Sequence, residues 1–362
     1  MNVILDKQQI LPLPAGYIAR NGKLEDYKIV FDLLNIHSQH MNGCNDLNDP
    51  ELIRVDWLNA GFNPETDVYL VFAPLVTVEK FKETSGVAPD GQPAAFVECW
   101  MSQEPPVHPW ISGCVHPAHW GKGIGSHIVT WAEDHARLAL EKCAPELRVA
   151  PRSGAEAHNK NGLALFEGLG WKHIRSFYRM VTALDVAPEI PALPAGITIR
   201  AYDPETELEA VYQTFVDSFK DHFGFIVPPY EKGLADFKHN LIEDPAYDPR
   251  FWLVAHDGKD IVGISVCRCE DPEDPECGWV NELGVRRDWR KHGLGYALLK
   301  SSFALFYADG KKRAGLGVDA SSLTGALRLY ERAGMRVLRQ FNQYEKEHRP
   351  GKELAVDSLE NT

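Results

Sequence analysis

The sequence predicts an α/β protein with a mixed α+β sheet, built as two similar domains in tandem. The chain has 362 residues, whereas a single hydrophobic core rarely serves more than ~250–300 residues. Residues 13–20 (LPAGYIAR) are repeated at residues 193–200 (LPAGITIR), each time as a turn that enters a strand. Each half continues with helices, several strands and a strand–helix–strand–helix run, which is typical of helices packed on a mixed sheet.

The internal repeat continues through both halves. A valine and two glycines recur together, and so does a leucine–aromatic pair that is followed by a glycine. These matches are Val115, Gly123 and Gly125 with Val285, Gly293 and Gly295, and Leu165, Phe166 and Gly170 with Leu329, Tyr330 and Gly334. A proline-rich stretch near residue 188 indicates a semi-rigid linker between the two halves. We therefore expect an N-terminal domain at residues 1–187, a C-terminal domain at residues 188–345 and a loose tail at residues 346–362.

Composition and charge narrow the class of function. The net charge is −13, from 38 Lys and Arg against 51 Asp and Glu, so nucleic acid is not expected as a partner, because phosphate binding needs a basic surface. No apolar run reaches the ~18 residues of a membrane span, and the chain does not start like a signal peptide. We expect a cytoplasmic protein with no membrane partner. Seven scattered cysteines and 14 histidines show no metal-binding spacing, so we expect reduced thiols and no metal.

The main functional motif lies in the second half, where a strand runs into a basic glycine loop that opens a helix. The strand ends at Val285, and the loop carries Arg290, Lys291, Gly293 and Gly295. A helix N-terminus attracts anions, and glycines let the backbone approach phosphate oxygens closely. The spacing is neither that of a P-loop nor that of a dinucleotide-binding fold. Since glycine turns begin many helices, the loop alone leaves a purely structural turn open.

Two paired motifs carry a resemblance to a known family. Arg290, Gly293 and Gly295 resemble the coenzyme A loop of the GNAT superfamily, Arg/Gln-x-x-Gly-x-Gly/Ala after a strand that ends in valine. The first half keeps the glycines but has Trp120 in place of the arginine. Residues 159–171 (NKNGLALFEGLGW) resemble the companion motif Asn-x-x-Ala-x-x-Leu-Tyr-x-x-x-Gly-Phe, and residues 322–335 repeat it with Ser322 at the asparagine position. The tandem arrangement resembles that of mycothiol synthase and its relatives.

The resemblance implies an N-acetyltransferase in which a primary amine attacks the thioester of acetyl-CoA directly. It implies that a backbone N–H at residues 283–285 polarises the thioester carbonyl and that Tyr330 protonates the leaving thiolate. Our candidate for the base that removes the amine proton is Glu282, three residues before Val285. Glu282 as a surface glutamate, Glu276 as the base, a water relay, and Tyr330 as a core tyrosine are the alternatives.

The predicted coenzyme-binding residues come from both copies of the loop. In the second half they are Leu283, Gly284, Val285, Arg290, Lys291, His292, Gly293, Leu294, Gly295, Tyr296 and Ser322, and in the first half Val115, Gly121, Lys122, Gly123, Ile124, Gly125, Ser126 and Asn159. The first half has Ser112 and Phe166 where the second has Glu282 and Tyr330. We therefore expect the N-terminal domain to be non-catalytic and the C-terminal domain to carry the chemistry.

The acceptor is the least constrained part of the prediction. Asp221, His222 and Trp279 are candidates for substrate binding, with helix capping and core packing as equally good interpretations of Asp221 and His222. We expect a small-molecule amine or a protein amino group as partner, and a monomer with an internal pseudo-dimer or a homodimer. A second class of function is a non-catalytic sensor that binds acyl-CoA, which loss of Glu282 and Tyr330 would have favoured.

Overall fold

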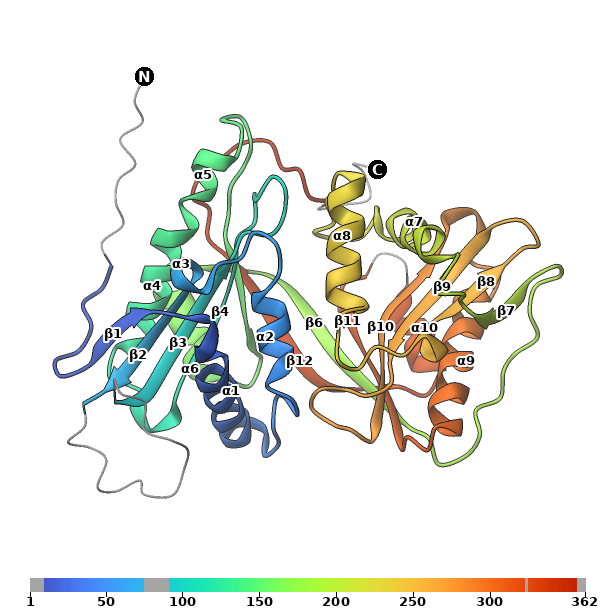
Figure 1. The fold of residues 1–362 in the computed structure, drawn as a ribbon, viewed down its shortest axis with the longest axis horizontal. Helices are drawn as coiled ribbons and strands as arrows, with labels where there is room; N and C mark the ends of the chain where they lie inside the picture. The colour runs from blue at the N-terminus through green and yellow to red at the C-terminus, as the bar shows by residue number, and fades with distance from the viewer. Residues whose placement is uncertain (1–9, 75–90, 323–324, 357–362) are drawn as a thin grey trace. The chain divides into compact units, whose positions relative to one another are not determined.

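The chain forms two compact units that do not coincide with the two halves of the sequence. The computed structural model describes residues 10–74, 91–322 and 325–356 (Figure 1). The first unit comprises Met1–Ile174 and Gln343–Glu353, and the second comprises Arg175–Asn342 and Leu354–Thr362. The first nine residues, on which the expected lack of a signal peptide rests, and the last six lie outside the described residues. Within the described part of the chain, no helix is long and apolar enough to span a membrane.

The first unit is built on a mixed sheet with the strand order β1-β2-β3-β4-β5, followed by the end of β12 (Arg336–Glu345). Neighbouring strands are antiparallel from β1 to β4, and β4 and β5 are parallel. Its elements are β1 (Ile18–Asn21), α1 (Tyr27–Asn42), α2 (Glu51–Trp57), α3 (Pro64–Asp67), β2 (Val68–Ala73), β3 (Gln92–Trp100), β4 (Trp110–Val115), α4 (Ile124–Ala136), α5 (Ala139–Lys142), β5 (Arg152–Glu156) and α6 (Lys160–Gly168).

The second unit repeats this plan with the strand order β6-β11-β10-β9-β8-β7. Here β10 and β11 form the parallel pair, and the other pairs from β6 to β7 are antiparallel. Its elements are β6 (Lys172–Ala183), β7 (Thr198–Ala201), α7 (Leu208–Phe219), α8 (Tyr230–Leu241), β8 (Leu253–His256), β9 (Ile261–Arg268), β10 (Cys277–Val285), α9 (Leu294–Ala308), β11 (Arg313–Asp319), α10 (Ala326–Arg332) and the start of β12 (Arg336–Glu345).

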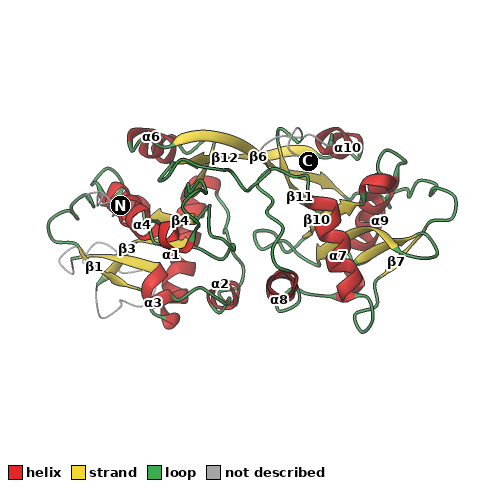
Figure 2. Ribbon diagram, turned by 90° about the horizontal axis from the view of Figure 1, so that it is seen from above, coloured by secondary structure: helices red, strands yellow, loops and turns green. Residues whose placement is uncertain are grey.

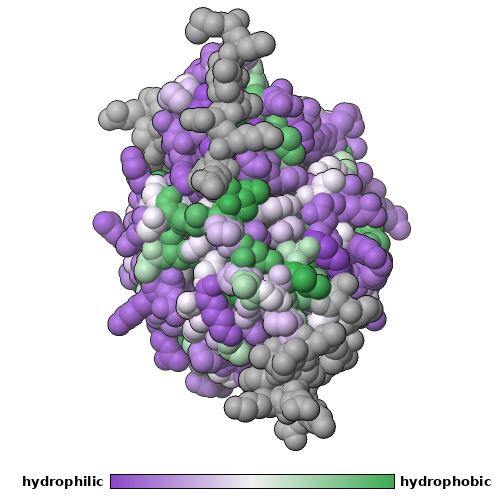
Figure 3. Space-filling view, turned by 90° about the vertical axis from the view of Figure 1, so that its left-hand side faces the viewer, coloured by the Kyte–Doolittle hydropathy of each residue, from purple (hydrophilic) through white to green (hydrophobic). Residues whose placement is uncertain are grey.

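Helices cover both faces of the sheet in each unit (Figure 2). Successive residues of β3 alternate between two cores: Ala95 and Val97 pack toward α4, and Phe96 packs toward α1 and α2. In the second unit, Ile264 and Val266 of β9 pack toward α7 and α8. Strands covered on both faces read as continuous apolar runs. The α/β prediction is therefore confirmed. On the face shown in Figure 3, hydrophilic residues surround a smaller group of apolar ones.

The end of each half of the sequence crosses into the other unit: most of β6 lies in the second unit, and the last residues of β12 lie in the first. Strand β6 comes from the first half, yet it pairs with β11 of the second unit from Phe177↔Asp319 to Ala183↔Arg313. The end of β12 and residues 346–353 belong to the first unit. The compact units thus differ from the predicted boundaries at 187/188 and 345/346. An apolar strand pattern shows that a segment joins a sheet, but it does not reveal which edge the segment joins.

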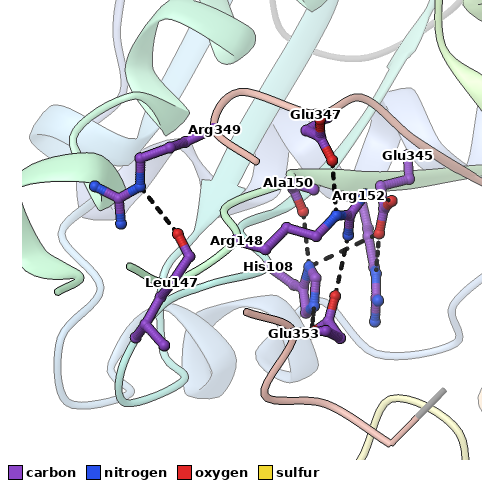
Figure 4. A network of polar contacts seen from close by, with 9 residues as sticks. All are labelled: His108, Leu147, Arg148, Ala150, Arg152, Glu345, Glu347, Arg349 and Glu353. Carbon is purple, nitrogen blue, oxygen red and sulfur yellow. Dashed lines mark hydrogen bonds and ion pairs between the residues drawn. The ribbon is translucent and has the colours of Figure 1, made fainter. Parts of the chain in front are cut away.

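Ion pairs hold residues 345–353, part of which was expected to be a loose tail, against the first unit. The network contains His108, Leu147, Arg148, Ala150, Arg152, Glu345, Glu347, Arg349 and Glu353 (Figure 4). Arg148 pairs with Glu345, with Glu347 at 2.9 Å and with Glu353 at 3.0 Å, and His108 Nε2 lies 2.9 Å from Glu353 Oε1. Among the described residues, the glutamates of 345–353 thus pair with charged side chains of the first unit.

Candidate active site

The two parallel strands of the second unit separate at a bulge in β10. The β10–β11 ladder ends at the pair Val280↔Leu316. On the other side of β10, the register with β9 shifts between Val280 and Glu282, so Asn281 is an extra residue in the strand. A bulge bends a strand and frees backbone groups from the ladder. Residues 281–285 therefore present one edge of β10 that no longer pairs with β11, which is where the predicted backbone N–H for the thioester carbonyl lies.

The glycine loop adopts the same conformation in both copies. Gly121 and Gly123 have φ angles of 73° and 85°, and Lys291 and Gly293 have φ angles of 67° and 84°. Helices α4 and α9 begin directly after Gly123 and Gly293. Amides in the first turn of a helix have no intrahelical acceptor and point toward an anion. Lys291 accepts a left-handed conformation that costs a non-glycine residue about 1–2 kcal/mol, which is typical of a functional loop.

Three glycines of the two loops border open space. A Cβ added at Gly121 or Gly293 would meet no atom within 4 Å, and one at Gly123 would meet only a Pro14 carbon, at 3.9 Å. These three positions therefore face open space, and their positive φ angles favour glycine. Gly295 differs, because a Cβ there would lie 3.4 Å from Leu329 of α10. That glycine serves the packing of two helices.

The side chain of Arg290 makes its contacts with residues of the second unit that lie next to the loop. Its guanidinium pairs with Asp221, donates to Ser218 O at 2.8 Å and donates to Val285 O at 3.1 Å. Burial raises the pKa of Asp221, but its hydrogen bond to Arg290 and the charge of Arg290 outweigh burial and lower it to about 2. Asp221 is buried in this ion pair, and its predicted part in substrate binding stays a prediction.

Trp120 takes over part of the arginine's role in the first unit. Its indole Nε1 donates to Val115 O at 2.7 Å, and Val115 ends β4 as Val285 ends β10. The Trp120 ring packs edge-on against His40 of α1, with 4.9 Å between ring centroids. The departure from the family motif therefore keeps the hydrogen bond that ties the loop to the strand end. It replaces the ion pair between Arg290 and Asp221, just after α7, by an aromatic contact with α1.

Glu282 and Tyr330 lie together in the second unit. Burial raises the pKa of Glu282 from 4.5 to about 8, although the side chain keeps some access to solvent. Burial also raises the pKa of Tyr330, and the nearby charge of Glu282 raises it further. At neutral pH the tyrosine is protonated, as a proton donor must be, and the pKa of the glutamate lies near neutrality, where a general base is most effective. The alternative base Glu276 is exposed and pairs with Arg313 at 3.1 Å.

The other predicted residues have varied surroundings. His222 lies beside Asp221, with 3.3 Å from Nδ1 to Oδ1, and burial lowers its pKa. Asn159 caps α6 by accepting from Gly162 N at 2.9 Å. The N-cap of α10 is Gly325, three residues after Ser322. Asn159 and Ser322 are therefore not equivalent in structure, although the motif aligns them.

A charged group around Trp279 was missed by sequence reasoning. The guanidinium of Arg179 lies 4.2 Å from the Trp279 ring centroid and pairs with Asp271 and with Glu273 at 3.2 Å. Arg179 stands on β6, so only the strand exchange brings it to β10 and β11. A Cβ on Gly315 would clash with the Trp279 ring at 2.6 Å. A glycine at this position of the strand is a sequence signal for a large side chain lying over β11.

The acetyltransferase (GNAT) family matches residues 55–171 and 208–335, once in each half. The chain belongs to the GNAT acetyltransferase family. Mycothiol acetyltransferase of Thermobispora bispora is 28% identical over 227 residues, which are 61% of this chain and 70% of the relative. The same enzyme of Streptomyces avermitilis is 31% identical over 227 residues, 61% of this chain and 66% of the relative.

Solved structures place this GNAT protein among tandem members of the family. A GCN5-related N-acetyltransferase from Sphaerobacter thermophilus has a TM-score of 0.74 and 30% identity, covering 95% of this chain and 99% of its own. A tandem GNAT protein from the clavulanic acid pathway has a TM-score of 0.62 at 14% identity, covering 93% and 100%, and shows the shared fold. The predicted tandem GNAT architecture is confirmed. The protein is an acyltransferase, and its family uses an acyl-CoA as co-substrate.

Proposed function

We propose that this GNAT protein is an N-acetyltransferase that moves an acetyl group from acetyl-CoA to a primary amine, with the chemistry in the second unit. The observation that carries the proposal is the pairing of Glu282 and Tyr330 at the fork between β10 and β11. The loop at Lys291 and Gly293 would hold the diphosphate through backbone N–H groups. Acetyl-CoA supplies the thioester that the amine attacks.

The residues at the fork divide the proton transfers between them. Glu282 takes the proton from the amine as the new C–N bond forms. A backbone N–H on the free edge of β10 donates to the carbonyl oxygen as it gains charge. Tyr330 gives its proton to the sulfur as the C–S bond breaks. Glu282 and Tyr330 lie close enough for their charges to interact, so both ends of the reaction are served within one site.

The acceptor is proposed from chemistry and from the relatives. The raised pKa of Glu282 suits removal of a proton from an ammonium group that titrates above neutrality. Because the relatives are named mycothiol acetyltransferase, a mycothiol-related amine is the first acceptor to test. Small primary amines and peptides with a free amino group complete the panel.

The test measures thiol release from acetyl-CoA with each amine, in the full chain and in two loop variants. Gly293→Glu puts a side chain and a negative charge into the second loop, and Gly123→Glu does the same in the first. We expect Gly293→Glu to abolish most turnover and Gly123→Glu to retain most of it. Turnover that stays near the wild-type level in Gly293→Glu would refute the assignment of the main chemistry to the second unit. Acetyl-CoA binding without turnover on any amine would favour a sensor.

A further inference from the structure

The first unit carries a carboxylate that alignment of the two halves does not reveal. Because Ser112 aligns with Glu282, the sequence alignment of the two halves indicates that the first half lacks a catalytic base. In the sheet, Ser112 of β4 lies directly opposite Glu98 of β3. In the second unit, Glu282 of β10 lies directly opposite Val266 of β9. Directly opposite residues of antiparallel strands share one face, with Cβ atoms about 5 Å apart. The first unit therefore has its carboxylate on β3, at the place across the sheet from the position that carries Glu282 in the second unit.

The fork in the first unit opens at this pair. Strands β4 and β5 pair only at Trp110↔Arg152 and Ile111↔Ser153, so Ser112 is the first residue beyond the ladder. The corresponding fork in the second unit opens after Val280. Glu98 and Glu282 thus flank the same point of the fold, each on the face covered by the first helices of its unit. The first unit also keeps the loop conformation at Gly121 and Gly123.

The surroundings of Glu98 suit an ammonium group. Trp57 Nε1 donates to Glu98 Oε2 at 3.0 Å, and the Trp100 side chain makes a second hydrogen bond to the carboxyl. Phe62 stacks on Trp100, with 3.7 Å between ring centroids. No cation among residues 10–74, 91–322 and 325–356 forms an ion pair with Glu98. A partly accessible carboxylate among aromatic rings attracts an amine by charge and by cation–π contact.

We propose that the first unit is a second acyl-transfer site, in which Glu98 removes the proton from the acceptor amine. The inference rests on the proposed function and extends it to the other unit. Burial raises the pKa of Glu98 to about 7, and the charge of Asp56 adds to this against the two indole hydrogen bonds. The carboxyl is therefore able to take and return a proton near neutrality.

The reaction at this site balances without a tyrosine. The amine nitrogen forms a bond to the thioester carbon while its proton passes to Glu98, and the C–S bond then breaks. Phe166 stands at the position of Tyr330 and has no proton to give. The thiolate therefore takes its proton from solvent, and Glu98 later releases its own proton to solvent. We expect this site to be slower than the second unit for the same amine.

The test isolates the first unit in the full-length protein. Glu282→Gln with Tyr330→Phe removes the proposed chemistry of the second unit and leaves both loops intact. We expect residual thiol release above the uncatalysed rate, and we expect addition of Glu98→Gln to lower it about 100-fold, as loss of a general base does. The Glu98→Gln variant keeps an amide oxygen for an indole hydrogen bond, and acetyl-CoA titration with circular dichroism checks the fold. The proposal is overturned if the residual thiol release equals the uncatalysed rate, or if Glu98→Gln leaves that residual release unchanged.

A strand swap provides a second, independent variant. Glu98→Val with Ser112→Glu gives the first unit the arrangement that Val266 and Glu282 have in the second. In the same background, we expect this pair to retain residual turnover that Glu98→Val alone loses. If both variants are folded and both lose the residual turnover, Glu98 and Glu282 are not equivalent. Full turnover in Glu282→Gln/Tyr330→Phe that disappears with Glu98→Gln would instead refute the second unit as the main site and support the first.

Discussion

Replacing Glu282 by glutamine should change both the pH profile and the stability of the protein. With a pKa of about 8, the carboxyl is about one tenth ionised at pH 7 and about half ionised at pH 8, so the rate that depends on it rises about fivefold over that unit. The ratio of wild-type to Glu282→Gln kcat/KM should therefore climb through pH 8 and level off above it. Comparison as a ratio cancels the titration of the amine itself.

The same shift makes a prediction for folding with a definite sign. The folded pKa of Glu282 is about 8 against 4.5 for the free side chain, so the stabilising contribution of the neutral carboxyl is complete below pH 4.5 and is lost as the pH rises through 8. A difference of this size corresponds to at most about 5 kcal/mol. Glu282→Gln, which is neutral at every pH, should therefore gain stability over wild type between pH 5 and pH 9.

The assay is urea unfolding of both proteins at pH 5 and pH 9, alongside thiol-release kinetics from pH 6 to 9. Glu276→Gln is the matched control, because Glu276 is exposed and pairs with Arg313 at 3.1 Å. We expect the control to leave the pH dependence of unfolding unchanged. Equal pH dependence of unfolding in wild type and Glu282→Gln would refute the burial argument. If the ratio of wild-type to Glu282→Gln kcat/KM does not change with pH while the pH dependence of unfolding does change, Glu282 is buried as described but takes no part in the proton transfer.

Three further predictions concern other parts of the structure. Tyr330→Phe should lower thiol release at least about tenfold while calorimetry shows acetyl-CoA affinity unchanged, and full activity would remove the tyrosine from the mechanism. Lys291→Gly should raise the free energy of unfolding by about 1 kcal/mol and Gly121→Lys should lower it by a similar amount, because both positions have positive φ; thermal unfolding that shifts in the same direction for both variants would contradict this. Residues 1–187 produced alone should aggregate, since residues 343–353 complete the first unit, and should become soluble on co-expression with residues 188–362. A stable, monomeric fragment 1–187 would contradict the importance of the exchange.

The glycine loops were predictable because they depend on local geometry. Positive φ at Gly123 and Gly293, followed at once by a helix, is a requirement that a few neighbouring residues express in the sequence. The partner of Arg290 was not predictable in the same way. For Asp221, substrate binding, helix capping and packing were equally good interpretations, and the structure places it just after α7 in an ion pair with Arg290. The sequence does not show whether a polar residue near a binding motif contacts the ligand or contacts the motif itself.

The sequence by itself determined the duplication, the α/β architecture and the two strand–loop–helix motifs, because each rests on residues close together in the chain. Only the tertiary structure decided what lies across from those motifs. Strand exchange brings β6 to the second unit and residues 343–353 to the first, and cross-strand pairing sets Glu98 opposite Ser112. The physical reason is that backbone hydrogen bonding between strands is the same for every sequence, so the pattern of a strand indicates that it pairs, whereas register and neighbour follow from packing of the whole sheet.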